Sequence, residues 1–169
     1  MDKGESAQSA VEVYLLRHAD AGNPDKWTGD DADRPLSPKG RRQAERLGRF
    51  LARNGFKPNA ILTSPKVRAH QTAELVAAAL GTRVETDHRL GMAVDIDLLS
   101  KIVAESGGQR VVLVGHDPDM SDLAAELMGA QYLPLKKGAL ARFDATLPLQ
   151  PAGAQLRWLV PPDLIAEEA

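Results

Sequence analysis

Val13-Tyr14-Leu15-Leu16-Arg17-His18 is an apolar run that ends abruptly in a cation and an imidazole. Its β-forming, almost wholly apolar composition is typical of a strand that is buried on both faces. The same pattern returns as Arg110-Val111-Val112-Leu113-Val114-Gly115-His116. Arg17 and Arg68 are available between the two histidines. Together these residues indicate phosphate chemistry, because the arginine side chain matches phosphate geometry and stays charged.

Length and composition limit the possible classes of protein. The chain has 169 residues, of which 43% are hydrophobic, and it contains no cysteine. That length suits one full domain, and the missing cysteines exclude thiolate catalysis, disulfides and cysteine metal sites. They also suit a reducing compartment, so we expect a cytoplasmic protein. The formal net charge of −2 gives no general attraction for nucleic acid or anionic lipid. We therefore expect neither a nucleic-acid partner nor a membrane partner.

A single domain is expected to span residues 11–160. The segment 1–10 is polar and rich in small residues, which predicts a flexible N-terminal tail. The segment 161–169 is rich in proline and then acidic, and it predicts a C-terminal tail. We expect a monomer or a weak dimer.

Strands and helices alternate along the predicted domain. The expected strands are residues 11–16, 59–63, 83–86, 110–114, 140–144 and 155–160. Two of the expected helices begin at the Ser-Pro pairs 37–38 and 64–65, where serine is the N-cap. Two further helices are expected at residues 95–106 and 119–128. This alternation predicts an α/β fold with a mostly parallel sheet.

The carboxyl edge of that sheet is the expected location of the site, because ligands of such folds bind outside the carboxyl ends of the strands. A histidine acts as a covalent nucleophile only while its imidazole is neutral. Neighbouring arginines oppose protonation, so a phosphate clamp also favours the reactive form. A second histidine could be cationic when a doubly charged substrate binds, and could donate to a phosphoryl oxygen.

Three segments resemble the histidine phosphatase superfamily, also called phosphoglycerate-mutase-like: LLRHADA, LTSPKVRAHQTAELVA and VVLVGHDPDMSDLA. The compact length and the segment RPLSPKGRRQA are most similar to the bacterial phosphohistidine phosphatase branch, the SixA type. The resemblance implies a three-layer αβα sandwich of the phosphoglycerate-mutase-like kind. It also implies a reaction through a covalent phosphohistidine, with no metal and no cofactor.

The resemblance implies a role for each matching residue. His18 would be the nucleophile, Arg17 and Arg68 would bind the phosphate, and His116 would complete the pocket as a donor to the phosphoryl oxygens. Arg68 falls in the first turn of its predicted helix, where backbone amides add attraction for an anion. Asn23 stands where some relatives place a phosphate-facing asparagine.

The proton donor is the point at which the sequence departs from the family pattern. Many relatives carry a glutamate where this chain has Met92, which cannot donate a proton. Asp117, directly after His116, and Asp20, two residues after His18, are the candidate substitutes. A general acid typically contributes about 10²–10⁴-fold. A phosphoramidate needs that help less than an alkyl phosphate, because imidazole leaves easily. The pattern therefore favours a phosphoramidate or another activated substrate.

The substrate is predicted from the size of the chain. The sequence lacks the long insertion that roofs the pocket in sugar-phosphate mutases, so an open cleft would admit a side chain on a protein surface. A partial lid is expected from the acidic loop 23–34, which contains Trp27. The favoured substrate is phosphohistidine in a protein such as a phosphotransfer domain.

Three alternatives to that substrate and function stay open. The first two are a small phosphorylated substrate for a phosphomonoesterase, and a phosphomutase. The third belongs to another class: a catalytically degenerate phosphoprotein-binding module. The basic face at Lys39, Arg41, Arg42, Arg46 and Arg49 is expected to be solvated, with docking of an acidic partner as the alternative.

Overall fold

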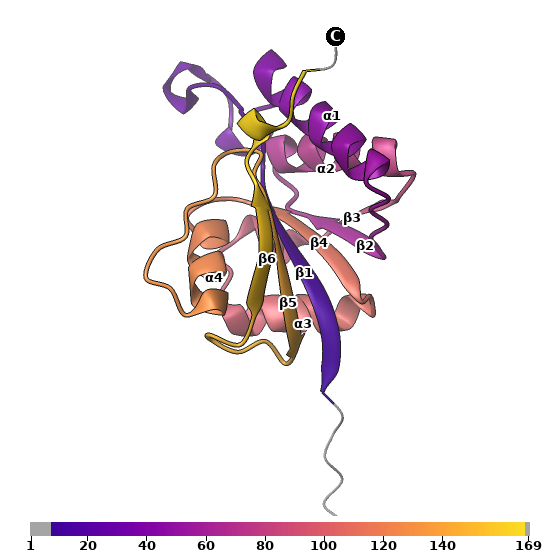
Figure 1. Cartoon of the computed structure of the whole chain (residues 1–169). Helices are drawn as coiled ribbons and strands as arrows, with labels where there is room; N and C mark the ends of the chain where they lie inside the picture. Colours follow the sequence, from indigo (N-terminus) through magenta and orange to yellow (C-terminus); the bar gives the residue numbers. More distant parts are fainter. Residues whose placement is uncertain (1–7, 168–169) are drawn as a thin grey trace, which may run out of the picture.

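Residues 8–167 are described by the structure, a computed structural model in which one six-stranded sheet lies between two layers of helices (Figure 1). The strand order is β3-β2-β4-β1-β5-β6. The pairs β1–β4, β2–β4 and β2–β3 are parallel, and β5 is antiparallel to both of its neighbours. The strands are β1 (Ser9–Arg17), β2 (Ala60–Thr63), β3 (Val84–Thr86), β4 (Arg110–Gly115), β5 (Leu140–Leu147) and β6 (Gln155–Val160). The predicted α/β class and the mostly parallel sheet are confirmed.

Four α-helices cover the sheet within the described residues. They are α1 (Pro38–Arg53), α2 (Val67–Leu80), α3 (Ile96–Ser106) and α4 (Asp119–Met128). Short 3-10 helices are η1 (Pro24–Lys26), η2 (Asp31–Asp33), η3 (His88–Gly91) and η4 (Pro162–Leu164). Within this part of the chain, no helix combines the length and the apolar character that a membrane span requires.

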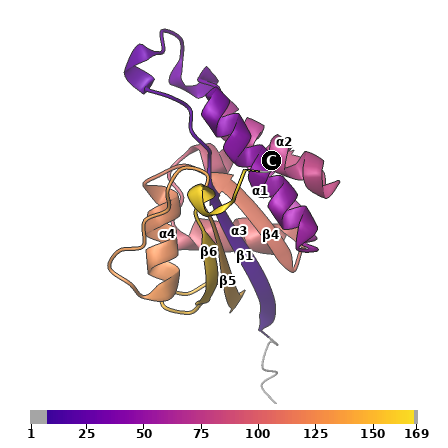
Figure 2. The ribbon, with the colours of Figure 1, turned by 45° about the horizontal axis from the view of Figure 1, so that its top comes forward.

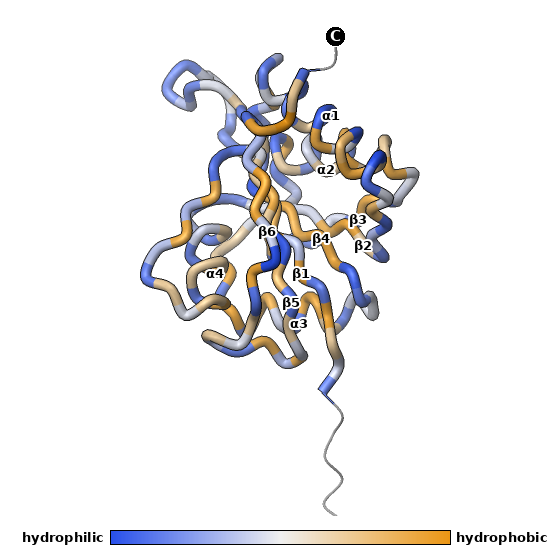
Figure 3. The backbone as a smooth tube through the Cα atoms, viewed as in Figure 1, coloured by the Kyte–Doolittle hydropathy of each residue, from blue (hydrophilic) through white to orange (hydrophobic). Residues whose placement is uncertain are grey.

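Strand β1 shows why its sequence is apolar at almost every position. Val13 and Leu15 pack into the core that β1 shares with α3 and α4. Tyr14 and Leu16 point the other way, into the core that β1 shares with α1 and α2. Successive strand side chains face opposite sides of a sheet, so a central strand between two helical layers needs apolar residues on both. Figure 3 shows hydrophobic stretches along the central strands, with hydrophilic residues in the outer loops.

The start of α1 is held close to the segment that follows β1. The hydroxyl of Ser37 accepts a hydrogen bond from the backbone N–H of Gly40 at 3.0 Å, which caps the helix as predicted. A Cβ atom on Gly40 would lie 1.9 Å from the backbone oxygen of Asp20. Only glycine permits this approach, which brings α1 to the carboxyl edge of the sheet.

The ends of the domain differ from the expected tails. β1 begins at Ser9, so the last residues of the predicted tail 1–10 are part of the sheet, and residues 1–7 lie outside the described part of the chain. The segment after β6 is anchored, since Pro162 is buried and Ile165 is only 5% exposed in the core beneath α1 and α2. These apolar side chains give the proline-rich segment a reason to pack.

Candidate active site

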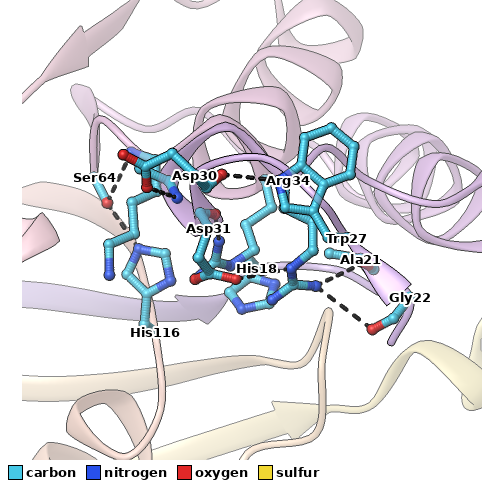
Figure 4. Close-up of polar contacts among 12 residues, drawn as sticks. His18, Ala21, Gly22, Trp27, Asp30, Asp31, Arg34, Ser64 and His116 are labelled. Atoms are coloured by element: carbon cyan, nitrogen blue, oxygen red, sulfur yellow. Dashed lines mark hydrogen bonds and ion pairs between the residues drawn. The ribbon is translucent and has the colours of Figure 1, made fainter. Parts of the chain in front are cut away.

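The two strand-end histidines meet at the carboxyl edge of the sheet. β1 and β4 are parallel neighbours, and their register pairs Arg17 with Gly115. His18 and His116 each follow those paired positions, so their rings reach the same level. The ring centroids lie 5.2 Å apart, with 52° between the ring planes. Figure 4 shows the two rings side by side.

His18 is buried, with 6% of its surface exposed. Its Nδ1 lies 2.7 Å from the backbone oxygen of Ala19. A carbonyl only accepts hydrogen bonds, so Nδ1 carries the hydrogen and Nε2 keeps a free lone pair. Burial lowers the pKa of His18 to about 4, and the positive charges of Arg68 and Arg17 contribute in the same direction. The ring is therefore neutral at pH 7, the form in which a histidine is nucleophilic.

His116 is held by a serine that sequence reasoning placed elsewhere. Its Nε2 lies 2.7 Å from the hydroxyl of Ser64, and that hydroxyl also accepts the backbone N–H of Lys66 at 3.2 Å. When the serine hydroxyl donates its hydrogen to Nε2, Nδ1 carries the ring hydrogen. Nδ1 is buried and has no hydrogen-bond partner among the described residues, so it can donate to a substrate oxygen.

His116 is neutral in the free protein, whereas a cation was expected only with a doubly charged substrate bound; the part played by Ser64 differs from the prediction. Burial, followed by the nearby His18 and Arg68, lowers the pKa of His116 to about 3, so the free protein holds it neutral. Ser64 was predicted to be the N-cap of the following helix. That helix, α2, begins at Val67 instead and has no side-chain cap.

The two arginines flank the imidazoles from different elements. Arg17 ends β1, and its Nη1 donates to the backbone oxygen of Leu135 at 2.9 Å. Arg68 is the second residue of α2 and so lies in its first turn, as predicted, and only 6% of its surface is exposed. In each guanidinium the Nε is buried and without a hydrogen-bond partner among residues 8–167. Both groups thus keep a donor that an oxyanion could use.

Asp31 is a site residue that sequence reasoning missed. Arg68 donates to it twice, from Nη1 to its backbone oxygen at 2.7 Å and from Nη2 to its Oδ2 at 3.0 Å. The buried Arg34 donates to Asp31 Oδ1 at 3.0 Å and to the backbone oxygen of Ala21 at 2.6 Å. Figure 4 shows Asp31 beside Arg34 and near the rings of His18 and His116.

The sequence of the loop that carries Asp31 predicted a lid but did not identify a site residue. Its length and acidity predicted a partial lid, but no spacing singled out Asp31. The hydrogen bond from Arg34 and the charge of Arg68 keep the pKa of Asp31 below its usual range. The ionised carboxylate thus sits on a guanidinium that was expected to bind phosphate.

The candidate proton donors are engaged elsewhere. Asp117 accepts from the backbone and hydroxyl of Ser121 at 3.0 and 2.7 Å, and its Oδ2 lies 3.2 Å from Arg17 Nη1. Asp20 accepts from the hydroxyl of Ser37 at 2.5 Å. Burial opposes ionisation of Asp20, but the Ser37 hydrogen bond and its other donors outweigh burial and lower its pKa. Both candidate proton donors thus already have hydrogen-bond partners in the free protein.

Two further positions singled out from the sequence, Asn23 and Met92, are exposed. The side chain of Asn23 caps η1 by accepting the backbone N–H of Asp25 at 3.0 Å, and it is exposed. Met92, at the position of the family's glutamate, is 72% exposed. Within residues 8–167, no three His, Cys, Asp or Glu side chains gather in a way that could hold a metal ion.

A buried imidazole and a partly buried one, both neutral, lie beside two guanidinium groups at the carboxyl edge of an α/β sheet. This arrangement defines a protein that handles phosphate. Comparison with known proteins makes this class specific. The model of the histidine phosphatase superfamily (branch 1) matches residues 13–91, and the chain belongs to that superfamily. It is accordingly a hydrolase of the phosphatase type.

Two relatives of the chain carry different names. The chain is 33% identical over 138 residues to an uncharacterised protein of Picosynechococcus, covering 77% of this chain and 82% of that protein. It is 34% identical over 115 residues to the Klebsiella pneumoniae protein named probable phosphoglycerate mutase GpmB, covering 64% of this chain and 52% of that protein. The chain thus spans about half the length of that relative.

Solved structures reproduce the whole fold. The protein histidine phosphatase SixA complexed with tungstate superposes with a TM-score of 0.77 at 24% identity, covering 92% of this chain and 100% of that one. A candidate phosphohistidine phosphatase SixA from Agrobacterium tumefaciens superposes with a TM-score of 0.72 at 26% identity, covering 89% of this chain and 97% of that one. The predicted likeness to the SixA branch is confirmed.

Proposed function

We propose that this protein hydrolyses phosphohistidine in a phosphorylated protein, through a covalent intermediate on His18. The observation that carries the proposal is the free Nε2 lone pair of His18, a buried and neutral histidine. Its ring centroid lies 5.2 Å from that of His116, and the positive charges of Arg17 and Arg68 are close enough to lower its pKa. These groups together suit attack on a phosphoryl group that is surrounded by donors.

In the first step, His18 Nε2 attacks phosphorus and forms a P–N bond. The P–N bond to the substrate imidazole breaks, and its electron pair goes to the departing nitrogen. When the other nitrogen of that imidazole carries a proton, the leaving group departs neutral. No side-chain acid is then required, which accords with the engagement of Asp117 and Asp20.

In the second step, water attacks the phosphorylated His18. The new P–O bond replaces the P–Nε2 bond, the electron pair returns to Nε2, and inorganic phosphate leaves. The hydrogen on Nδ1, which is donated to the backbone oxygen of Ala19, makes His18 itself a neutral leaving group. One hydrogen bond thus keeps His18 ready for both attack and departure.

The transition state of each step spreads negative charge over the equatorial phosphoryl oxygens. We assign the stabilisation of that charge to Arg17, Arg68 and the Nδ1 hydrogen of His116. All three are fixed before substrate arrives: Arg17 by Leu135, Arg68 by Asp31 and His116 by Ser64. Preorganised donors stabilise developing charge without the cost of reorienting.

A second candidate function is hydrolysis of a small phosphate monoester. It is favoured by a relative from Mycolicibacterium smegmatis named 8-oxo-(d)GTP phosphatase, 36% identical over 75 residues. A phosphomutase has less support, since the chain spans about half of the GpmB relative. A degenerate binding module has less support too, because the histidines and arginines are all present. We place the protein in the cytoplasm, as the lack of cysteines suits a reducing compartment.

Phosphoryl transfer from a labelled donor tests the proposal directly. After an acid-free quench, we expect the wild-type protein to carry phosphate that is labile in acid and stable in alkali, and His18→Ala to carry none. A panel of phosphohistidine, phosphoserine, phosphotyrosine, sugar phosphates and an aryl phosphate then ranks kcat/KM. Label that persists in His18→Ala excludes His18 as nucleophile, and a preference for a sugar phosphate favours the second candidate.

A further inference from the structure

A second concave surface lies next to the proposed phosphate site. We call it the basic cleft: a cavity of about 420 Å³ lined by Arg17, Asp20, Lys39, Gln43, Arg46, Lys136, Lys137, Pro162 and Asp163. Five of these residues are basic and two are acidic, although the whole chain has a net charge of −2. Arg17 belongs to both surfaces, so whatever fills the basic cleft lies beside the phosphoryl group.

Besides Arg17 and Asp20, three separate segments form the walls of the basic cleft. Lys39, Gln43 and Arg46 follow one another at helical spacing, which places them on one face of α1. The loop before β5 contributes Lys136 and Lys137, and η4 contributes Pro162. Figure 2 shows η4 beside α1. Two of the basic residues of α1, Lys39 and Arg46, thus line a cleft, whereas Arg41, Arg42 and Arg49 are exposed as predicted.

Carboxylates of the chain itself already show what the basic cleft binds. Lys137 Nζ lies 3.5 Å from Asp20 Oδ1, and Lys136 Nζ lies 3.8 Å from Asp163 Oδ2. Arg46 Nη1 lies 3.0 Å from Glu167 Oε1, which is on the segment that follows η4. The polypeptide from η4 onward therefore brings two carboxylates to these cations, Asp163 within η4 and Glu167 after it.

The lysines of the basic cleft remain accessible to a partner, whereas the side chain of Arg46 is 19% exposed. The side chains of Lys136 and Asp163 are 74% and 69% exposed, and that of Glu167 is 73% exposed. Lys39 is exposed and makes no ion pair within the described residues. Exposed pairs of this kind are weak and exchange easily for other carboxylates.

We propose that the basic cleft binds the acidic residues that flank the phosphorylated side chain of a protein substrate. This inference rests on the proposed function and adds the kind of sequence that the substrate carries. The lysines lie on separate walls of the cleft, so their long side chains can each reach a different carboxylate along a polypeptide. The second phosphate group of a small substrate is compact, and lysines spread in this way would hold it less well. Charge complementarity of this sort chiefly sets specificity and encounter rate.

Two phosphohistidine peptides of equal length test the proposal, one with glutamates beside the phosphohistidine and one with glutamines. The protein variants are the double substitution Lys39→Glu with Lys136→Glu, and Lys101→Glu on α3 as a matched charge reversal outside the basic cleft. p-Nitrophenyl phosphate reports on the phosphate site alone. Circular dichroism melting checks that each variant is folded.

We expect the wild-type protein and Lys101→Glu to prefer the glutamate peptide by about tenfold in kcat/KM, from a few exposed ion pairs. The double variant should lose this preference and keep its activity on p-nitrophenyl phosphate. The preference should also shrink as salt is raised, because exposed charges are screened. Equal use of the two peptides by the wild-type protein, or a preference that survives in the double variant, overturns the proposal.

The remaining outcomes separate the two levels of inference. If a short-chain bisphosphate loses affinity in the double variant while the peptide preference does not change, the cleft serves a small substrate and the proposal fails. If neither phosphopeptide is hydrolysed while p-nitrophenyl phosphate is, the proposed function fails instead. In that case the binding of the labelled glutamate peptide is measured by fluorescence anisotropy. Weaker binding by the double variant than by the wild-type protein and Lys101→Glu supports docking in the basic cleft, and equal binding overturns it.

Discussion

The carboxylate of Asp31 lies on the guanidinium of Arg68, with Oδ2 3.0 Å from Nη2 and the Asp31 backbone oxygen 2.7 Å from Nη1. The carboxylate therefore occupies one of the donors that a phosphate would use, and the backbone carbonyl of the same loop residue occupies a second. Asp31 is also close enough to His116 to affect its pKa electrostatically, in the upward direction. A substrate that reaches Arg68 through these donors has to displace Asp31 or share the guanidinium with it.

Asp31→Asn tests this competition. The substitution keeps the shape of the side chain and removes its charge, so inorganic phosphate should inhibit the variant at a concentration about two- to tenfold lower, in line with the modest strength of partly exposed ion pairs. Inhibition of p-nitrophenyl phosphate hydrolysis by phosphate is the measurement. Asp33→Asn, in the same 3-10 helix, is the control. Weaker or unchanged inhibition in Asp31→Asn contradicts the competition.

The protonation of the two site histidines gives a prediction about pH. With folded-state pKa values of about 4 for His18 and about 3 for His116, both rings should remain neutral down to about pH 5. Histidine-selective nitrogen NMR measures this, with His18→Ala and His116→Ala to assign the signals. A site histidine that titrates near its ordinary value of about 6.5 refutes the assignment of a neutral pair.

The same pKa values predict how stability depends on pH. The unfolded chain binds protons at these histidines near pH 6.5, whereas the folded chain does so only near pH 4 and 3. Between those values the unfolded state holds more protons, so the free energy of unfolding should fall as the pH drops below about 6.5. Urea unfolding from pH 7 to pH 4 measures the loss. His18→Ala should show a shallower slope than the wild-type protein, and an identical slope removes His18 as a cause.

Ser64→Ala tests the support of His116. Without the hydroxyl, Nε2 of His116 loses its partner at 2.7 Å, and the ring is free to change its tautomer or turn. We expect a fall in kcat of about tenfold with a smaller change in KM, and a loss of about 1 kcal/mol in stability, the usual net value of one hydrogen bond.

Ser106→Ala is the matched control for that experiment, because its hydroxyl donates to the backbone oxygen of Val103 at 2.6 Å, at the end of α3. It should cost stability without lowering kcat. The nitrogen shifts of His116 supply a readout that a purely structural effect would leave unchanged. Full kcat in Ser64→Ala would mean that the hydroxyl does not position the ring.

Gly40→Ala tests the close contact between α1 and the segment that follows β1. The added Cβ would meet the Asp20 backbone oxygen at 1.9 Å, so helix and segment must separate. We expect a loss of about 1–3 kcal/mol or more in urea unfolding, typical of overpacking, together with reduced activity, because the displaced segment follows His18. Arg42→Ala, exposed on the same helix, should change stability by less than about 0.5 kcal/mol. Equal stability of both variants would contradict the contact.

The sequence by itself determined the α/β architecture and the meeting of four site residues. The strand ends at Arg17 and His18, and at Gly115 and His116, are local features, and parallel neighbours bring such ends to one edge. Arg68 joins them because a helix that follows β2 starts at the same edge. Periodicity and short motifs encode these relations, so they could be predicted before any coordinates were known.

Only the tertiary structure decided how these residues are held and which groups surround them. Asp31 meets Arg68 across 37 positions of sequence, and Ser64 meets His116 across 52. The contacts of Asp117, a candidate acid, with Ser121 and Arg17 are likewise made only by the folded chain. Such contacts depend on the paths of loops, which follow no repeating pattern of polar and apolar residues, and on burial, which the fold alone creates. For the same reason the neutral state of both histidines, and the basic cleft between α1, η4 and the loop before β5, exist only once the chain has folded.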